Sequence, residues 1–456
     1  MTTDIPGPAP ARGFLAQLRL AQHIQRDMLG TFGAWRREYG DFYQVQFGDV
    51  QQFFLAHPDD LREVLVTQAG QFIKDRDYRD PQTGLARFLG NGLLTSDGEF
   101  WKRQRRLAAP ALHARRIEAY AQTMVDFALR TAAGWSTGAR LDVAAEMTRL
   151  TMLIVAKALF SADVAGDVER VGRAMDAIQQ RMGHRLPLPP WLPTPSELRA
   201  RRAGRDLDEI VYGLIRQRRA TGEDTGDLLS MLLLAEDDDG QRMTDRQARD
   251  EVVTLFLAGH ETTANTLNWT WTLLAQHPAI EARLHAELDT VLAGRAPTLA
   301  DLPHLRYTEM VIKESLRLYP PAWAYSREAA AAVALGERRV PQGSVVVLMV
   351  YFTHHDPRWW PEPERFDPER FSPEREAEIP RYAYLPFGAG PRVCIGNSFA
   401  LMEARLLLAT LASRYRLTLA PGQRVEPEPL ITLNPKGGLP MTAHARVPAP
   451  APQAVA

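Results

Sequence analysis

The sequence is almost free of cysteine: Cys394 is the single one among 456 residues. One sulfur cannot form an internal disulfide, a paired redox site or an all-cysteine zinc site. Scarcity of cysteine is typical of proteins from reducing compartments, so we expect a cytoplasmic protein. Any chemistry that uses a thiol must use this one alone.

The sequence also lacks a large net charge, and its N-terminus lacks a long apolar run. The formal net charge is -1, so no overall field points to a nucleic-acid partner. Residues 1–20 contain prolines and arginines but no long apolar stretch. We therefore expect neither a signal peptide nor a membrane anchor.

Most of what is present has helical periodicity. Strands are expected at 42–47, 52–55 and 344–350, and Gly48 with Asp49 forms a turn between the first two. The helices that we expect are 140–163, 166–183, 195–220, 244–277, 279–293, 305–318 and 397–414. The predicted fold class is mainly α with small β-sheets (α+β).

The domain organisation follows from composition. We expect a flexible N-terminus over 1–12, a single domain over 13–446 and a disordered Pro/Ala tail over 447–456. The proline-rich stretch 186–193 cannot be helical, because prolines lack the backbone donor and fix φ. It is either a locally packed apolar loop or a lid over an apolar pocket.

The longest predicted helix begins at Thr244, where Gln247 completes a capping box, and ends at the Pro278 stop. At 1.5 Å per residue it is roughly 50 Å long and crosses a whole domain. Its apolar middle is interrupted by the polar run 260–263, which is either a satisfied buried network or functional. A zinc-protease motif is excluded, because Ala264 stands where the second histidine is required.

Cys394 lies in a glycine-rich loop directly before a helix. A lone cysteine is commonly a small buried hydrophobe. Here Gly388, Gly390 and Gly396 let the backbone turn tightly and approach a flat group. The helix predicted from Asn397 directs its dipole and free N–H groups at the sulfur, which lowers a thiol pKa. Such a thiolate can bind a haem iron, whose potential those donors tune.

The segment Phe387-x-x-Gly390-x-Arg392-x-Cys394-x-Gly396 resembles the haem-binding signature of the cytochrome P450 family. Three further segments match in the expected order, so the resemblance covers about 35–440. It implies the P450 fold over a single catalytic domain, with haem b between the long central helix and the helix after the cysteine loop. Cys394 would be the axial ligand of the iron. The resemblance further implies contact with the haem ring by Phe387, Gly388, Gly396, Ala258 and Gly259.

The first of these segments, 258–263, is similar to the oxygen-activation segment of the family. The resemblance implies a locally distorted helix in which Thr262 hydrogen-bonds the oxygen and Glu261 belongs to a proton relay. Such a pair is needed because splitting dioxygen to leave water consumes two protons. The thiolate supplies electron density from the other side.

The second segment contains Glu314 and Arg317, which share a helix face. By itself such a pair is a surface ion pair worth roughly 0–1 kcal/mol. It resembles the structural ion pair of the family, with Arg370 as the third member. Their implied role is to hold the loop that presents Cys394.

The third segment places Trp101 and Arg105 on one helical face. By resemblance they hold the haem propionates together with Arg327 and Arg392, since carboxylates prefer guanidinium and indole donors. The neighbouring cations, which are expected to remain exposed, are Lys102, Arg103 and Arg106. They are either a solvated face or a docking patch for an acidic electron-transfer protein.

The activity that the resemblance implies is insertion of one atom of O2 into an apolar organic substrate, by hydroxylation or epoxidation. The expected pocket includes Leu255, Ala258, Ala322, Trp323 and the 77–95 region. We expect no fused flavin or iron–sulfur portion, so electrons from NAD(P)H should arrive through a separate ferredoxin or flavodoxin and its reductase.

Two alternatives remain. A peroxygenase would use H2O2, but Glu261 and Thr262 argue against it, because such enzymes recruit an acid from the substrate. A non-enzymatic haem-thiolate sensor of gases or ligands gives no reason for an acid–alcohol pair.

Overall fold

The computed structural model describes residues 5–160, 168–183, 194–222 and 224–447. The proline-rich stretch 186–193, the first four residues and the tail 448–456 lie outside the described residues, so the predictions made for them stay predictions.

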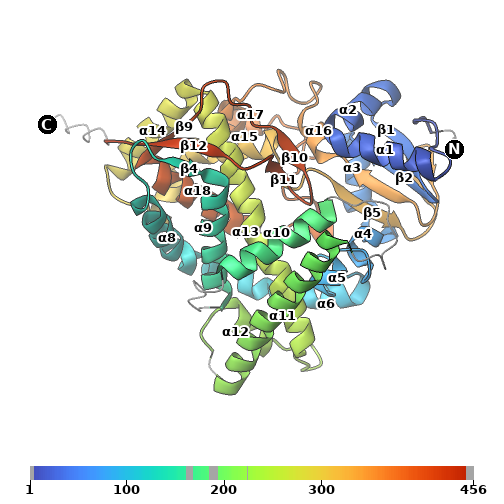
Figure 1. Cartoon of the computed structure of the whole chain (residues 1–456), viewed down its shortest axis with the longest axis horizontal. Helices are drawn as coiled ribbons and strands as arrows, with labels where there is room; N and C mark the ends of the chain where they lie inside the picture. Colours follow the sequence, from blue (N-terminus) through green and yellow to red (C-terminus); the bar gives the residue numbers. More distant parts are fainter. Residues whose placement is uncertain (1–4, 161–167, 184–193, 223, 448–456) are drawn as a thin grey trace.

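Helices form most of the molecule (Figure 1). The α-helices are α1 Phe14–Arg26, α2 Met28–Tyr39, α3 Pro58–Arg62, α4 Arg76–Arg79, α5 Ala86–Leu89, α6 Gly98–Ala108, α7 Ala114–Ile117, α8 Ala121–Ala133, α9 Val143–Phe160, α10 Val168–Gly183, α11 Pro195–Thr221, α12 Leu228–Leu234, α13 Asp245–Gln276, α14 Pro278–Leu292, α15 Arg306–Leu318, α16 Val350–His354, α17 Pro373–Glu376 and α18 Asn397–Ala412.

The strands form small sheets. They are β1 Phe42–Phe47, β2 Val50–Leu55, β3 Phe72–Ile73, β4 Arg140–Asp142, β5 Tyr325–Ala329, β6 Val333–Leu335, β7 Arg338–Val340, β8 Val345–Leu348, β9 Tyr415–Leu419, β10 Pro427–Pro429, β11 Leu433–Pro435 and β12 Pro440–Ala445. The largest sheet has the order β1-β2-β8-β5-β3, in which β2 and β8 are parallel. The others are β4-β12-β9, β6-β7 and β10-β11.

The helix α13 runs through the middle of the molecule, with the sheet strands β1 and β2 on one side and the strands β4, β9 and β12 on the other (Figure 1). Thr244 caps it as predicted: its hydroxyl accepts from the Gln247 N–H at 3.3 Å, and the Gln247 side chain accepts from the Thr244 N–H at 2.8 Å. Both reciprocal bonds satisfy N–H groups that have no partner within the helix. Such an anchored, 32-residue helix can support a site along its whole length.

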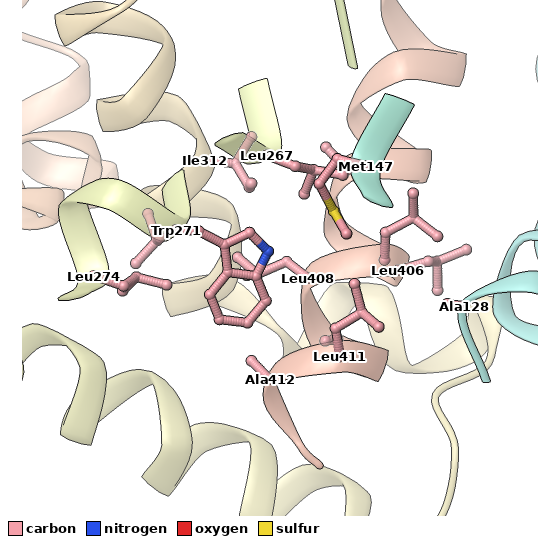
Figure 2. Packing of buried hydrophobic residues seen from close by; sticks show 14 of the residues in the cluster. Ala128, Met147, Leu267, Trp271, Leu274, Ile312, Leu406, Leu408, Leu411 and Ala412 are labelled. Carbon is pink, nitrogen blue, oxygen red and sulfur yellow. The ribbon is translucent and has the colours of Figure 1, made fainter. Parts of the chain in front are cut away.

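The main hydrophobic core lies where α13 packs against α9, α15 and α18. Figure 2 shows Trp271 of α13 beside Leu408 and Leu411 of α18, with Met147 of α9 nearby. These side chains are fully buried. Burying one large apolar side chain stabilises the folded state by about 1.5–3 kcal/mol. Because α18 follows the cysteine loop directly, this core fixes the position of that loop relative to α13.

The mainly helical fold class is confirmed, as is the hairpin of β1 and β2 around Gly48. One expectation was wrong. Residues 140–142 form strand β4 instead of the first turn of a helix, because they pair with Pro440–Thr442 of β12. Within the stretch predicted to be a flexible N-terminus, Ile5 is buried in the core under the large sheet, and the Pro6 carbonyl accepts from the Gln44 N–H at 2.9 Å.

Candidate active site

A cavity of about 380 Å³ lies between α13, the loop 386–396 and the start of α18. It brings together side chains from α6, α13, β5 and the cysteine loop, which are far apart in the sequence. The predicted site residues that line it are Trp101, Arg105, Leu255, Ala258, Gly259, Glu261, Thr262, Ala322, Arg327, Phe387, Gly388, Arg392, Cys394 and Gly396.

The cysteine loop contains a tight turn that glycine makes possible. Gly388 and Gly390 have φ of 70° and 68°, in the left-handed region that favours glycine. A Cβ at Gly390 would also overlap the Leu65 carbonyl oxygen. The loop closes where the Cys394 N–H donates to the Phe387 carbonyl oxygen at 2.9 Å. The sulfur is thereby presented to the cavity directly before α18.

The electrostatics of Cys394 differ from the prediction. Burial raises the pKa of the Cys394 thiol above its usual value, although the Gly396 N–H and Arg105 both lower it. The protein atoms packed around Cys394, whose side chain still faces the cavity, outweigh the effect of the helix N-terminus on which the prediction rested. A bound metal ion would reverse this balance, since a coordinating thiol is deprotonated.

One end of the cavity is strongly cationic. The Arg392 guanidinium lies 4.2 Å from the centroid of the Trp101 ring, and that of Arg105 lies 5.8 Å from it. Arg105 also donates to the Val393 carbonyl at 2.9 Å, which ties α6 to the cysteine loop. Arg327 is 8% exposed, and burial lowers its pKa. The four predicted propionate partners therefore gather at one place.

Lys74 is a further cation at this end that was not predicted from the sequence. Its side chain is buried and lines the cavity. Burial lowers the pKa of Lys74 well below its usual value, and the nearby Arg327 and Arg392 lower it further. No motif surrounds Lys74, so no signal in the sequence distinguishes it from an exposed lysine.

These residues fit haem. Lys74, Arg105, Arg327 and Arg392 outnumber the neighbouring carboxylates of Asp75 and Asp97, so the site attracts further negative charge of the kind that two propionates carry. Burial lowers the pKa of Arg392 to about 10, a cost that an added carboxylate would offset. Apolar walls and a sulfur suit the ring and its iron.

The middle of α13 supplies the polar groups. The Thr262 hydroxyl donates to the Ala258 carbonyl at 2.7 Å, and Glu261 accepts from the Thr432 hydroxyl. The expected local distortion is not observed, since α13 is α-helical throughout. A Cβ at Gly259 would lie 3.1 Å from a methyl of Val155, so its lack of a side chain serves the packing of α9.

His260 and Thr263, the remaining members of the polar run, are satisfied within the helix. The His260 Nδ1 lies 2.7 Å from the Phe256 carbonyl oxygen, and burial lowers its pKa to about 4, so the ring is neutral at pH 7. The Thr263 hydroxyl donates to the Gly259 carbonyl at 3.2 Å. Of the polar run, Glu261, Thr262 and Thr263 line the cavity, whereas His260 is buried away from it.

Glu314 and Arg317 form a fully buried bidentate ion pair, with N–O distances of 2.7 and 2.8 Å. The Arg370 Nε lies 3.3 Å from Glu314, as predicted for the third member. Arg317 also donates to the His354 carbonyl at 2.8 Å. The sequence analysis missed His354, whose Nε2 accepts from the Leu385 N–H at 2.8 Å. This histidine connects the ion pair to the start of the cysteine loop.

The exposed cations after Trp101 are paired. Arg103 and Arg106 contact Asp237 and Asp238 at 2.5 and 2.8 Å, and Lys102 pairs with its helix neighbour Glu99. Arg103 is largely shielded, with 21% of its side chain exposed, contrary to the prediction. Asp237 and Asp238 come from a loop whose contact with α6 was not predicted from the sequence.

The substrate side of the cavity is mostly apolar. Leu255, Ala258 and Ala322 line it, as do Tyr78, Leu85, Leu93 and Leu94 of the expected 77–95 region. Trp323 is not among the lining residues: its indole donates to the Leu430 carbonyl at 3.1 Å and its ring packs on another core cluster. The sequence analysis missed Ile431 and Thr432, which reach the cavity from the tip of the β10–β11 hairpin.

The chain belongs to the cytochrome P450 family, whose model matches residues 5–440. Cyclooctat-9-en-7-ol 5-monooxygenase of Streptomyces melanosporofaciens is 41% identical and covers 86% of this chain and 88% of that protein. Pentalenene oxygenase of Streptomyces avermitilis is 37% identical over 97% of each chain. The solved haem domain of cytochrome P450DA has a TM-score of 0.83, 27% identity, and coverage of 94% of this chain and 96% of that one.

The protein is thus a P450 monooxygenase that carries haem and acts on an apolar substrate. Among the described residues, no helix has the length and apolar character needed to cross a membrane.

Proposed function

We propose that the enzyme hydroxylates or epoxidises a cyclic terpene, with electrons from NAD(P)H delivered by a separate ferredoxin or flavodoxin and its reductase. The observation that carries the proposal is the shared cavity: Cys394, Thr262, Glu261 and an apolar wall all border the same space. The names of the relatives, which include pentalenene oxygenase, support a cyclic hydrocarbon as the substrate class.

Cys394 would bind the haem iron, with Phe387, Gly388, Gly396, Ala258 and Gly259 against the ring. The residues that would hold the propionates are Trp101, Arg105, Arg327, Arg392 and Lys74. Bound haem supplies the activation of dioxygen. The single catalytic domain over 13–446 stays a prediction, which the family match over 5–440 supports.

The chain itself would manage protons and position. The overall reaction converts substrate RH, O2, two electrons and two protons into ROH and water. The carboxyl of Glu261 is a group that can take up and release a proton, and the hydroxyl of Thr262 lies one residue away at the cavity wall. Leu255, Ala258 and Ala322 would exclude water from the space in which the substrate lies.

Two measurements test the proposal. Reduced protein with CO should show the long-wavelength Soret band of a thiolate-bound haem, and Cys394→His should abolish it. Purified enzyme with ferredoxin, reductase and NADPH should convert members of a cyclic-terpene panel to products heavier by one oxygen atom. Product formation with H2O2 that outpaces the NADPH-driven reaction would instead favour a peroxygenase.

A further inference from the structure

The carboxyl group of Glu261 is held by the tip of a hairpin that also forms the cavity wall. Leu430–Thr432 connect β10 to β11, and Ile431 and Thr432 line the cavity. The Thr432 hydroxyl donates to Oε1 of Glu261. Glu261 and Thr432 are 6% and 7% exposed, so this hydrogen bond is shielded from bulk water. The hairpin tip that borders the cavity therefore also contacts the acid.

The direction of that hydrogen bond is determined by two neighbouring amides. Asn265 of α13 and Asn434 of β11 each donate an N–H to the Thr432 oxygen, both at 3.1 Å. These donors occupy the acceptor positions of the hydroxyl, which leaves its one hydrogen for Glu261. Oε1 of Glu261 must then be an acceptor.

The amides are themselves held in place. Asn265 donates to Oδ1 of Asn434 at 2.8 Å, and its own Oδ1 accepts from Asn268 at 3.3 Å. One turn further along α13, the Trp269 indole donates to the Leu433 carbonyl at 2.9 Å. The hairpin tip is thus fastened to α13 by several hydrogen bonds, and Thr432 has little freedom to turn.

We propose that Thr432 is a positioning residue for proton delivery: its hydroxyl orients the Glu261 carboxyl at the cavity wall. This inference rests on the role of Glu261 in the proposed function. Without the hydroxyl the carboxyl loses a buried donor and can adopt other orientations. Oxygen that receives its protons at the wrong position is released as H2O2, so the product formed per NADPH decreases.

A double-mutant cycle separates action through Glu261 from a general structural role. Thr432→Val keeps the shape and removes the hydroxyl, whereas Thr432→Ser restores it. Thr410→Val is the matched control, since Thr410 is also buried, in α18, and its hydroxyl donates to the Leu406 carbonyl of its own helix at 2.7 Å. Each holoenzyme is assayed for product and H2O2 per NADPH, for substrate affinity by the Soret shift, and for its urea midpoint.

We expect T432V to reduce product per NADPH by about threefold while the substrate affinity stays within about twofold, a pattern of lost transition-state rather than ground-state interaction. T432S and T410V should match the parent. In an E261Q background T432V should cause no further decrease, and the urea midpoints of the cycle should be non-additive.

Two results would overturn the inference in different ways. If E261Q lowers product per NADPH but T432V does not, or if the two effects are additive, Thr432 does not act through Glu261 while the proposed role of Glu261 stands. If E261Q itself leaves product per NADPH unchanged, both the acid role of Glu261 and the role of Thr432 are wrong.

Discussion

The Nε2 atom of His354 accepts a 2.8 Å hydrogen bond from the N–H of Leu385, two residues before the cysteine loop begins at Phe387. The opposite ring nitrogen lies 3.1 Å from the Arg317 carbonyl oxygen. Because Nε2 accepts, Nδ1 carries the proton and donates, so the ring is a neutral tautomer. Burial lowers the pKa of His354 to about 3, which keeps it neutral at pH 7. This neutral ring links the Glu314–Arg317 pair to the loop that carries Cys394.

Replacing His354 should loosen the cysteine loop. His354→Ala leaves two buried backbone groups without partners, and each costs about 1–3 kcal/mol. We expect a decrease in unfolding free energy of about 2–5 kcal/mol, together with partial loss of the thiolate-type CO band. His113→Ala, at an exposed position, should change neither quantity. An unchanged CO band in a destabilised His354→Ala protein would show that the loop holds its position without the histidine.

The buried ion pair should not tolerate lysine. Arg317 uses three nitrogens for Glu314 and for the His354 and Arg365 carbonyls, and a lysine cannot reproduce that planar fork. Arg317→Lys should lower stability by about 3–5 kcal/mol, the cost of breaking a buried pair, and reduce the haem content of the purified protein. Arg365→Lys, in an exposed pair with Glu362, should cost under about 1 kcal/mol. Equal losses in the two variants would contradict a special role for burial.

The cationic end of the cavity should govern retention of haem. Arg392→Leu removes a guanidinium that is 16% exposed, whereas Arg106→Leu removes one that is 66% exposed. Losing one charge-assisted contact of about 1.5–3 kcal/mol corresponds to roughly a tenfold to hundredfold faster release of haem. Transfer of haem to an excess of apomyoglobin measures that rate. The Arg106 variant should release haem at the parental rate, and a parental rate for the Arg392 variant as well would exclude the propionate role.

The buried acid Glu403 of α18 should make the fold less stable at high pH. Burial raises the pKa of Glu403 to about 8, although Thr263 lowers it. Between about 4.5 and 8 the folded chain binds one proton more than the unfolded chain, so stability decreases as pH rises through this window. Glu403→Gln removes that loss.

The gain from Glu403→Gln should be largest near pH 8, on the order of 4 kcal/mol, and absent below about pH 4.5. Urea denaturation at several pH values measures it. Glu374→Gln, at an exposed position, should follow the parent at every pH. A Glu403→Gln protein that is less stable than the parent at pH 8 would show that the ionised carboxylate is held by partners after all.

Local sequence patterns correctly predicted those features of the fold that depend only on residues close together in the chain. The capping box at Thr244, the proline after His277 and the glycine turn between β1 and β2 act within a few residues, and the structure shows each where it was predicted. Strand β4 could not be predicted in this way, because its partner β12 lies some three hundred residues away in the chain. Lys74, His354 and Thr432 carry no motif, and only their neighbours in space give them a role.

The sequence by itself determined the class of chemistry. A lone cysteine in a glycine-rich loop, an acid next to a threonine in a long helix and an E-x-x-R pair are patterns of residue type and spacing. The tertiary structure decided the environment of each. Burial raises the pKa of the Cys394 thiol. The fold also brings Lys74 next to the arginines, turns Trp323 away from the cavity and places the Thr432 hydroxyl on Glu261. Solvent exclusion and contacts between distant segments arise only when the chain folds, so local sequence patterns could not predict them.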